Sequence, residues 1–246
     1  FGPIHALREV SLDIRAGEVL ALLGENGAGK STHMNVLSGA HRPDGGSVEM
    51  NGQPLALSGP LAARKAGIAM IYQELTLAPH LTVEENVTLG LEEDRCRFLQ
   101  SQAAKVPEAP ALPGLEDISP RQKAGSLTIA RQQVVEIARA IVSDARVVIM
   151  DEPTSSLSKE DKEALFRVIR KLREEGIAVV YISHFLEEVN EIADRYTILR
   201  DGESVSEGVI ADSTPESLVE QMIGRKLDDM YPEPSHQIGE TVLTVK

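Results

Sequence analysis

Several residue types are scarce in this chain of 246 residues, and each shortage excludes a class of protein. The single cysteine, Cys96, rules out an internal disulfide and fits a reducing compartment. There is no tryptophan, and only four tyrosines and four phenylalanines, too few for a platform that stacks single-stranded nucleic acid. No apolar run approaches the roughly 20 residues that a membrane-spanning helix needs, and no secretory signal opens the sequence.

Basic residues are also in deficit, because 25 Lys and Arg stand against 38 Asp and Glu, a net charge of −13. Nucleic-acid binding needs clustered cations to meet the phosphates, so we expect no nucleic-acid partner. The charge does not argue against a protein partner that lies in a membrane. The length allows one large domain, or a domain with a subdomain.

The most informative stretch is residues 24–31, which read Gly-Glu-Asn-Gly-Ala-Gly-Lys-Ser. This is a complete G-x-x-x-x-G-K-[ST] phosphate-binding loop, preceded by the apolar run 19–23 and followed by a helical pattern from Lys30 to Leu37. In that context backbone N–H groups and a helix N-terminus surround phosphates. Lys30 is expected to reach the β- and γ-phosphates, and the Ser31 hydroxyl to bind Mg²⁺.

Short apolar runs recur along the chain and alternate with helical patterns in its second half. The expected strands are residues 48–50, 68–72, 147–150, 178–182 and 196–199. Ser158 and Thr214 are expected to cap helices, the second one ending at Gly224. Continuous apolar strands separated by helices predict an α/β fold with a doubly wound sheet.

The middle of the chain has a different pattern. No strand pattern is present from about Glu74 to Ala140, which predicts a helical insertion with helix starts at Thr82 and near Ala130. Residues 105–121 contain four prolines, which break helices, so we expect a loop there. The stretch after Arg225 reads as a linker before a final β-like run at 241–245.

A second group of residues completes the expected site. The apolar run 146–150 ends in Asp151 and Glu152, and we expect this strand to lie beside the phosphate-loop strand. Asp151 would then hold the Mg²⁺ shell, and Glu152 would orient the attacking water. Lys30 and Asp151 are too far apart in sequence for a minimal kinase or small GTPase, which again indicates an insertion.

With these residues the chain resembles the nucleotide-binding domains of ABC transporters over essentially its whole length. Phe1 stands where an aromatic ring stacks on adenine, and Gln73 matches the glutamine that joins the Mg²⁺ and γ-phosphate site to a helical subdomain. Residues 155–158 match the D-loop, and His184 the switch histidine at the γ-phosphate. The resemblance implies a P-loop NTPase fold: a RecA-like α/β core, an antiparallel β subdomain and a helical subdomain.

The resemblance also implies a division of the chain and a set of site residues. Residues 1–73 and 141–224 would form the core with the β subdomain, residues 74–140 the helical subdomain, and residues 225–246 a linker. Catalysis would fall to Lys30, Glu152 and His184, and the metal to Ser31, Gln73 and Asp151. ATP would be bound by Phe1, Gly24, Glu25, Asn26, Gly27, Ala28, Gly29, Lys30, Ser31, Thr32 and Gln73.

One motif departs from the family pattern. The signature, usually Leu-Ser-Gly-Gly-Gln, is here Leu127-Thr128-Ile129-Ala130-Arg131. In this family a signature completes the ATP site of a partner domain. Thr128 keeps a hydroxyl that can reach a phosphate, whereas the Cβ of Ala130 is expected to hold the backbone away from it.

The departure, with residues 23–29, 72–75 and 222–232, looks like the N-terminal half of tandem monosaccharide importers of the ribose, xylose and galactose type. That implies ATP and Mg²⁺ as cofactors, a second ABC domain in the same polypeptide, a membrane permease, and indirectly a periplasmic sugar-binding protein. The chain would be peripheral, on the cytoplasmic face of the inner membrane. The alternatives are a cytosolic ABC ATPase acting on ribosomes or DNA, and a regulatory domain that binds ATP without hydrolysing it.

Overall fold

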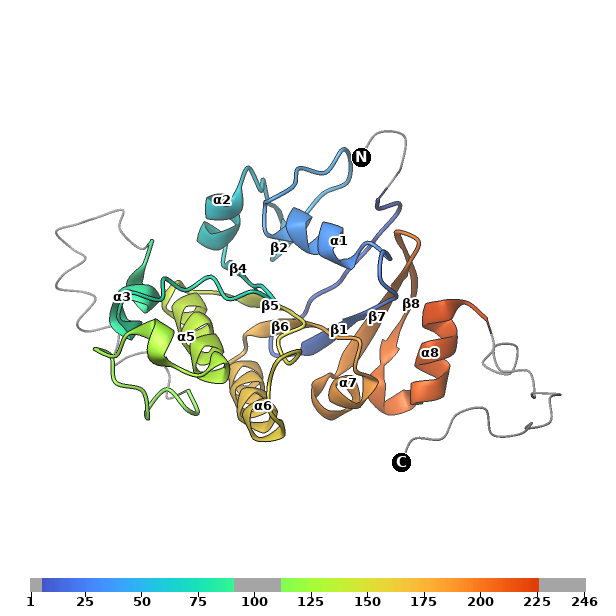
Figure 1. The fold of residues 1–246 in the computed structure, drawn as a ribbon. Helices are drawn as coiled ribbons and strands as arrows, with labels where there is room; N and C mark the ends of the chain where they lie inside the picture. Colours follow the sequence, from blue (N-terminus) through green and yellow to red (C-terminus); the bar gives the residue numbers. More distant parts are fainter. Residues whose placement is uncertain (1–5, 91–111, 226–246) are drawn as a thin grey trace, which may run out of the picture.

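The computed structural model describes residues 6–90 and 112–225 (Figure 1). The expectations for Phe1, Cys96 and the strand at 241–245 lie outside these residues. No helix of the described part is long and apolar enough to cross a membrane.

A six-stranded sheet forms the centre of the described fold, with the order β4-β5-β6-β1-β7-β8. All neighbours are parallel except β7 and β8, which form an antiparallel hairpin. Every residue of β1 and β6 is buried, as expected for strands that helices cover on both faces. The strands are β1 (Val19–Leu23), β4 (Ile68–Ile71), β5 (Val147–Asp151), β6 (Ala178–Ile182), β7 (Arg195–Arg200) and β8 (Glu203–Val209).

Helices lie on both faces of this sheet, with α1 and α2 on one side and α6, α7 and α8 on the other (Figure 1). Met34 of α1 packs on Leu22 of β1, whereas Leu218 of α8 packs with Leu23. The helices are α1 (Lys30–Leu37), α2 (Pro60–Lys65), α6 (Lys159–Glu174), α7 (Leu186–Ile192) and α8 (Pro215–Ile223). The predicted α/β class and doubly wound sheet are therefore confirmed.

The predicted helix boundaries are confirmed where capping chemistry marks them. Ser158 accepts a hydrogen bond from the backbone N–H of Asp161 at the start of α6. Thr214 forms a capping box at the start of α8, and Gly224 ends that helix with a φ of 78°. A left-handed residue at this position is the reason glycine follows a helix.

The insertion is helical in its described part. It contains α3 (Val83–Thr88), the 3₁₀ turn η1 (Ala124–Ser126) and α5 (Ile129–Val142), and the described residues of 74–140 form no strand, only one isolated bridge between Thr82 and Lys123. The predicted helix start at Thr82 is confirmed, and Thr82 caps α3 in a reciprocal box with Glu85. The proposed division at residues 73, 140 and 224 remains a prediction.

The expected position of the strand that ends at Asp151 is wrong, and the expected antiparallel β region is short in the described residues. The strand that ends at Asp151 does not lie beside β1, because β6 lies between β5 and β1. An apolar pattern identifies strands but not their order, since every parallel strand here has the same character. The antiparallel β region is, in the described residues, a two-residue ladder between β2 (Glu49–Met50) and β3 (Gln53–Pro54), apart from the β7–β8 hairpin.

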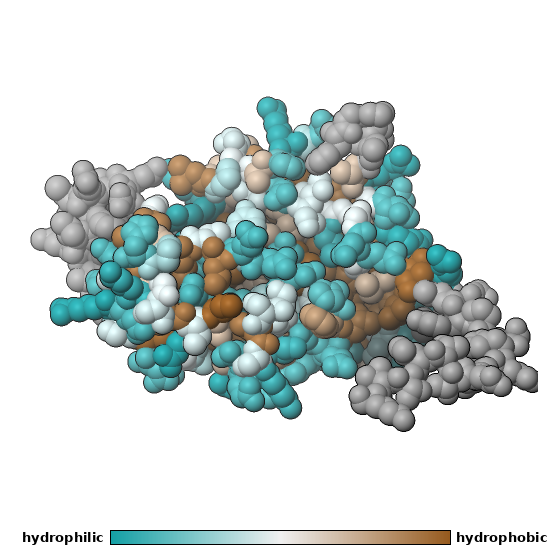
Figure 2. Space-filling view, viewed as in Figure 1, coloured by the Kyte–Doolittle hydropathy of each residue, from teal (hydrophilic) through white to brown (hydrophobic). Residues whose placement is uncertain are grey.

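Polar and charged side chains cover most of the face seen in Figure 2, interrupted by apolar ones over the α3–α5 region and near α8. The large exposed apolar residues of the described part are Leu61, Tyr72, Leu89, Ile129, Phe185, Val205 and Val209. They are scattered over separate elements, so most require no special explanation.

Candidate functional site

The loop between β1 and α1 is built on glycines that nothing else could replace without strain. Gly24 and Gly29 have φ values of 148° and 102°, in the region that L side chains rarely adopt. A Cβ at Gly29 would lie 2.9 Å from Leu7 Cδ2, and one at Gly24 would collide with the Leu199 carbonyl oxygen. The loop is therefore pressed between the N-terminal segment and β7, and leads directly into α1.

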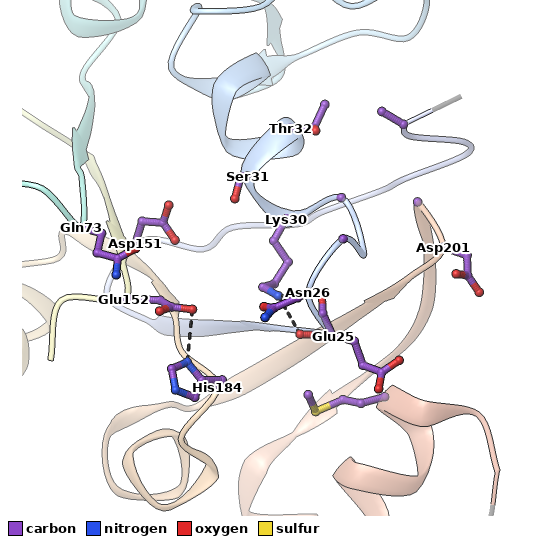
Figure 3. Close-up of a pocket in the computed structure, with 16 residues that line it drawn as sticks. Glu25, Asn26, Lys30, Ser31, Thr32, Gln73, Asp151, Glu152, His184 and Asp201 are labelled. Carbon is purple, nitrogen blue, oxygen red and sulfur yellow. Dashed lines mark hydrogen bonds and ion pairs between the residues drawn. The ribbon is translucent and has the colours of Figure 1, made fainter. Parts of the chain in front are cut away.

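The helix α1 starts at Lys30, and its N-cap Gly29 offers no side chain to cap it. The first N–H groups of such a helix remain available, and with the positive end of its dipole they favour an anion. Lys30 Nζ donates to the carbonyl oxygens of Gly24 at 2.6 Å and Glu25 at 3.1 Å, so it reaches back across the loop (Figure 3). Burial lowers the pKa of Lys30, and the charges of Glu152 and Asp151 partly oppose that.

Four further predicted residues meet the loop from the carboxyl ends of three strands. Gln73 follows β4, Asp151 ends β5 with Glu152 directly after it, and His184 follows β6 (Figure 3). The His184 Nδ1 atom lies 3.2 Å from Glu152 Oε1. Carboxyl ends of parallel strands meet at one edge of the sheet, and α/β proteins bind ligands at that edge.

Backbone geometry and charge set Glu152 and Asp151 apart from ordinary strand ends. Glu152 has a φ of 45°, unusual for a residue with a side chain, and its N–H donates to the Ile182 carbonyl oxygen at 3.0 Å. Burial raises the pKa of Asp151, the charge of Glu152 raises it further, and Lys30 opposes both. A positive ligand placed here would therefore relieve an unfavourable charge.

These residues enclose one cavity of about 1310 Å³. Twelve of the predicted residues line it: Gly24, Glu25, Asn26, Gly27, Gly29, Lys30, Ser31, Thr32, Gln73, Asp151, Glu152 and His184. Ala28 does not, because it is buried at 5% exposure beneath the loop. Phe1 lies outside the described residues.

Sequence reasoning missed four residues of the cavity wall: Ala6, Asp201, Gly202 and Met222. Asp201 and Gly202 both have positive φ values, 52° and 80°, as the central residues of a tight hairpin turn require. The Asp-Gly pair is a readable hairpin signal, but its place beside the phosphate loop depends on strand order, which the sequence does not reveal.

The residues predicted to hold a metal suit one particular kind of ion. No group of three His, Cys, Asp or Glu side chains lies together within residues 6–90 and 112–225, so a protein-only metal centre is absent there. Ser31, Gln73 and Asp151 offer a hydroxyl, an amide and a carboxylate, all hard oxygen donors. Mg²⁺ prefers such oxygens and completes its shell with phosphate oxygens and water, so the donor set fits a Mg–nucleotide complex.

The signature segment does not meet the cavity. Thr128 caps α5 by accepting a hydrogen bond from the Arg131 N–H at 3.4 Å, while Leu127 and Ala130 are buried. Ala130 packs within this chain, and the expectation that its Cβ holds the backbone away from a partner's phosphate remains a prediction. Thr128, Ile129 and Arg131 are the exposed members.

Comparisons with known proteins agree with this geometry. Residues 7–155 match the ABC transporter family. A ribose import ATP-binding protein of Streptomyces avermitilis is 46% identical over the whole chain, which covers 49% of that protein. A putative ribose/galactose/methyl galactoside import ATP-binding protein of Ralstonia nicotianae is 44% identical, again over the whole chain and 48% of the relative. The chain thus spans about half the length of these relatives.

Solved structures show the same fold. The ADP conformation of MJ1267, an ATP-binding cassette of an ABC transporter, aligns with a TM-score of 0.77 at 25% identity and covers 95% of both chains. The dimeric cassette MJ0796 aligns with a TM-score of 0.71 at 28% identity, covering 85% of this chain and 94% of that one. The P-loop NTPase fold is confirmed, and the chain belongs to the ABC transporter family.

Proposed function

We propose that this chain binds Mg·ATP in the described cavity and hydrolyses it to power import of a monosaccharide through a membrane permease. One observation carries the proposal: Glu152 and His184 form a pair 3.2 Å apart, in a cavity whose opposite wall is the phosphate loop with Lys30. A positioned carboxylate opposite a phosphate-binding cation is the arrangement that phosphoryl transfer to water requires.

Each residue then has a chemical task. Lys30 exchanges its contacts with the loop carbonyls for the β- and γ-phosphates and stabilises the charge that builds on the leaving oxygen. Ser31, Asp151 and Gln73 would hold Mg²⁺, which neutralises phosphate charge when bound. Glu152 accepts a hydrogen bond from the attacking water and aligns it with the γ-phosphorus. His184, joined to Glu152, contacts the γ-phosphate side.

The exposed signature supports a role for a second domain. Thr128 and Arg131 lie outside the cavity of their own chain, so they serve a nucleotide held by another domain. We propose that this other domain lies in the same polypeptide, as expected from relatives about twice as long. The cavity described here pairs with the partner's signature and hydrolyses ATP, whereas residues 127–131 complete a site of slower turnover.

The names of the relatives support the transport role and the peripheral location. The relatives are named as ribose and galactose import ATP-binding proteins, and import requires a path through the membrane, so we place this chain on the cytoplasmic face beside a permease. A periplasmic sugar-binding protein acts with the permease and does not touch this chain.

The test is steady-state phosphate release by the full polypeptide that carries this chain, alone and with its permease, compared with Glu152→Gln. We expect Mg·ATP binding in both proteins and at least about 100-fold slower turnover in the variant. Binding without turnover in the wild type would instead support a regulatory domain. Stimulation by nucleic acid rather than by the permease would support a cytosolic ABC ATPase.

A further inference from the structure

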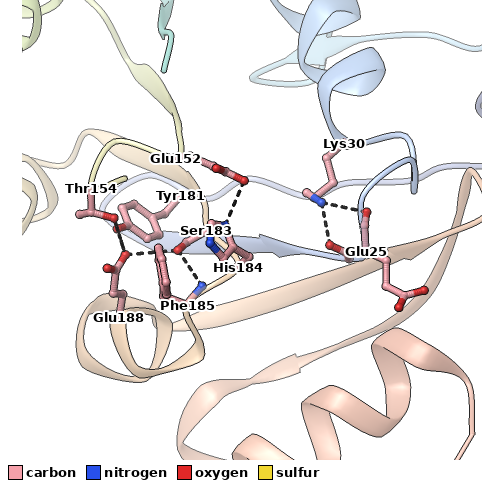
Figure 4. Close-up of polar contacts among 10 residues, drawn as sticks. Glu25, Lys30, Glu152, Thr154, Tyr181, Ser183, His184, Phe185 and Glu188 are labelled. Atoms are coloured by element: carbon pink, nitrogen blue, oxygen red, sulfur yellow. Dashed lines mark hydrogen bonds and ion pairs between the residues drawn. The ribbon is translucent and has the colours of Figure 1, made fainter. Parts of the chain in front are cut away.

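A buried carboxylate lies behind the candidate site. Glu188 of α7 is 3% exposed, and one of its oxygens accepts hydrogen bonds from three hydroxyl groups (Figure 4). The donors are Thr154 Oγ1 at 2.7 Å, Tyr181 Oη at 2.7 Å and Ser183 Oγ at 3.2 Å. Its other oxygen forms an ion pair with Lys162 Nζ. We call these five residues the Glu188 cluster.

The Glu188 cluster joins the two loops that carry the reacting pair. Thr154 lies two residues after Glu152, in the turn that follows β5. Ser183 directly precedes His184, and its Oγ also accepts a hydrogen bond from the Phe185 N–H at 3.0 Å. The Ser183 hydroxyl therefore links the residues on both sides of His184, and it is itself hydrogen-bonded to Glu188.

The carboxylate stays charged despite its burial. Burial raises the pKa of Glu188, but hydrogen bonds from Lys162, Thr154 and Tyr181 outweigh it and leave the pKa below its usual value. Burial raises the pKa of Tyr181, so its hydroxyl remains a donor. A buried anion is tolerated only when its partners are in place, so a cluster of this kind resists rearrangement.

Glu152 needs such support, because its φ of 45° is a conformation that the surrounding structure must impose. The Thr154 hydroxyl is held to the same oxygen as that of Ser183. A shift of either loop would therefore break a buried hydrogen bond. The contact between Glu152 Oε1 and His184 Nδ1 depends on both loops at once.

We propose that Glu188 is a positioning residue that keeps Glu152 and His184 in reacting geometry by binding Thr154 and Ser183 with one carboxylate oxygen. The inference rests on the proposed function, because it assigns Glu188 to the hydrolysis step of that site. A residue that acts only on this geometry affects turnover and leaves nucleotide binding by the phosphate loop intact.

The first test is Glu188→Gln in the full polypeptide. Glutamine has nearly the same shape, but its amide must point an NH₂ group either at the three hydroxyls or at the Lys162 ammonium. We expect kcat for ATP hydrolysis to fall about tenfold, with the Kd for Mg·ATP changed less than about twofold. Glu188→Asp keeps the charge and should recover part of kcat.

The matched control is Glu18→Gln. Glu18 is also a buried carboxylate, at 8% exposure, with its Oε1 3.3 Å from Arg195 Nη1. It precedes β1, at the end of that strand away from the phosphate loop. We expect a comparable loss of thermal stability without a loss of kcat. Equal falls of kcat in the two variants would overturn the proposal.

A double-mutant cycle with His184→Ala tests the route of the effect. If Glu188 acts through the reacting pair, adding Glu188→Gln to His184→Ala should lower kcat less than about twofold further. Fully additive losses would contradict the proposal. If Glu188→Gln folds poorly, Tyr181→Phe replaces it in this test. That variant removes one hydrogen-bond donor to Glu188 and keeps the ring, so its kcat should fall by a smaller factor.

Amide hydrogen exchange separates this inference from the proposed function. Glu188→Gln should speed exchange in both residues 152–156 and residues 183–185, whereas Glu18→Gln should change neither. A wild-type protein that binds ATP without turnover would refute the proposed function. Unchanged exchange in the two segments would refute the cluster's role, whatever the wild-type turnover.

Discussion

The cavity and the signature segment are built in opposite ways. In the cavity, polar side chains from different elements face one another: Glu152 and His184 lie 3.2 Å apart, and the half-buried Lys30 lies within electrostatic reach of Asp151 and Glu152. In the signature, the Thr128 hydroxyl caps its own helix. The exposed signature side chains do not line the cavity formed by the described part of the chain. One region is complete in its chemistry, whereas the other needs a second surface.

Removing the central cation of the complete region should have the largest effect. Lys30→Ala should weaken Mg·ATP binding at least tenfold and lower kcat by at least about 100-fold, because Lys30 is the only Lys or Arg among the described residues that line the cavity. Fluorescent-nucleotide titration and phosphate release measure the two quantities. Near-normal turnover would mean that the cavity is not the reacting site.

Gln73→Ala should affect coupling more than binding. Gln73 lines the cavity at the start of the insertion, so it is placed to transmit nucleotide binding to the helical region. We expect sugar uptake driven by ATP to fall about tenfold, and the affinity for ATP less than about threefold. Gln53→Ala, on the exposed strand β3, is the control. Equal losses of ATP affinity and sugar uptake would mean that Gln73 only binds the Mg·ATP complex and does not couple it to transport.

Asp151→Asn should raise the thermal stability of the nucleotide-free chain, although it removes a carboxylate proposed to hold Mg²⁺. Because the pKa of Asp151 is raised above 3.8 in the folded chain, ionising it costs folding free energy as the pH rises through that folded pKa. The variant should therefore melt about 2 °C higher than wild type at neutral pH without nucleotide, with the difference vanishing in acid. Mg·ATP should raise the Tm of wild type far more. A lower Tm for the ligand-free variant would contradict this.

Substitutions in the signature should have the smallest effects on nucleotide binding. They should affect only one of the two ATP sites that the paired domains form. Thr128→Ala should destabilise α5 by about 1 kcal/mol through loss of its cap. Arg131→Ala should weaken nucleotide binding only at the slower site, by a few-fold, because a guanidinium there meets phosphate from the partner domain. Site-resolved nucleotide trapping measures it. An equal loss of nucleotide binding at both sites would contradict the assignment of the signature to the slower site alone.

The sequence was sufficient for those parts of the molecule that local chemistry determines. The phosphate loop, the capped starts at Thr82, Ser158 and Thr214, and the αL end at Gly224 all follow from residue types at fixed spacing. These features need only neighbours within a few residues.

What could not be predicted depends on how distant segments meet. The position of β6 between β5 and β1 is one case, since parallel apolar strands carry no label for their order. The inward placement of Ala130 is another, because it follows from the packing of α5. The wall residues Asp201 and Gly202 are a third, since a hairpin turn becomes part of a site only through the sheet.

The strand order has a consequence for synthesis of the protein. β1 is wholly apolar and lies between β6 and β7, which are synthesised about 160 and about 175 residues later. At about 5–20 residues per second, the nascent chain carries this unpaired strand for on the order of ten seconds or more. The phosphate loop directly follows β1, so it is also made well before β6 and β7. The cavity wall also includes His184 and Asp201, so bound nucleotide can stabilise β1 only after those later residues have been made.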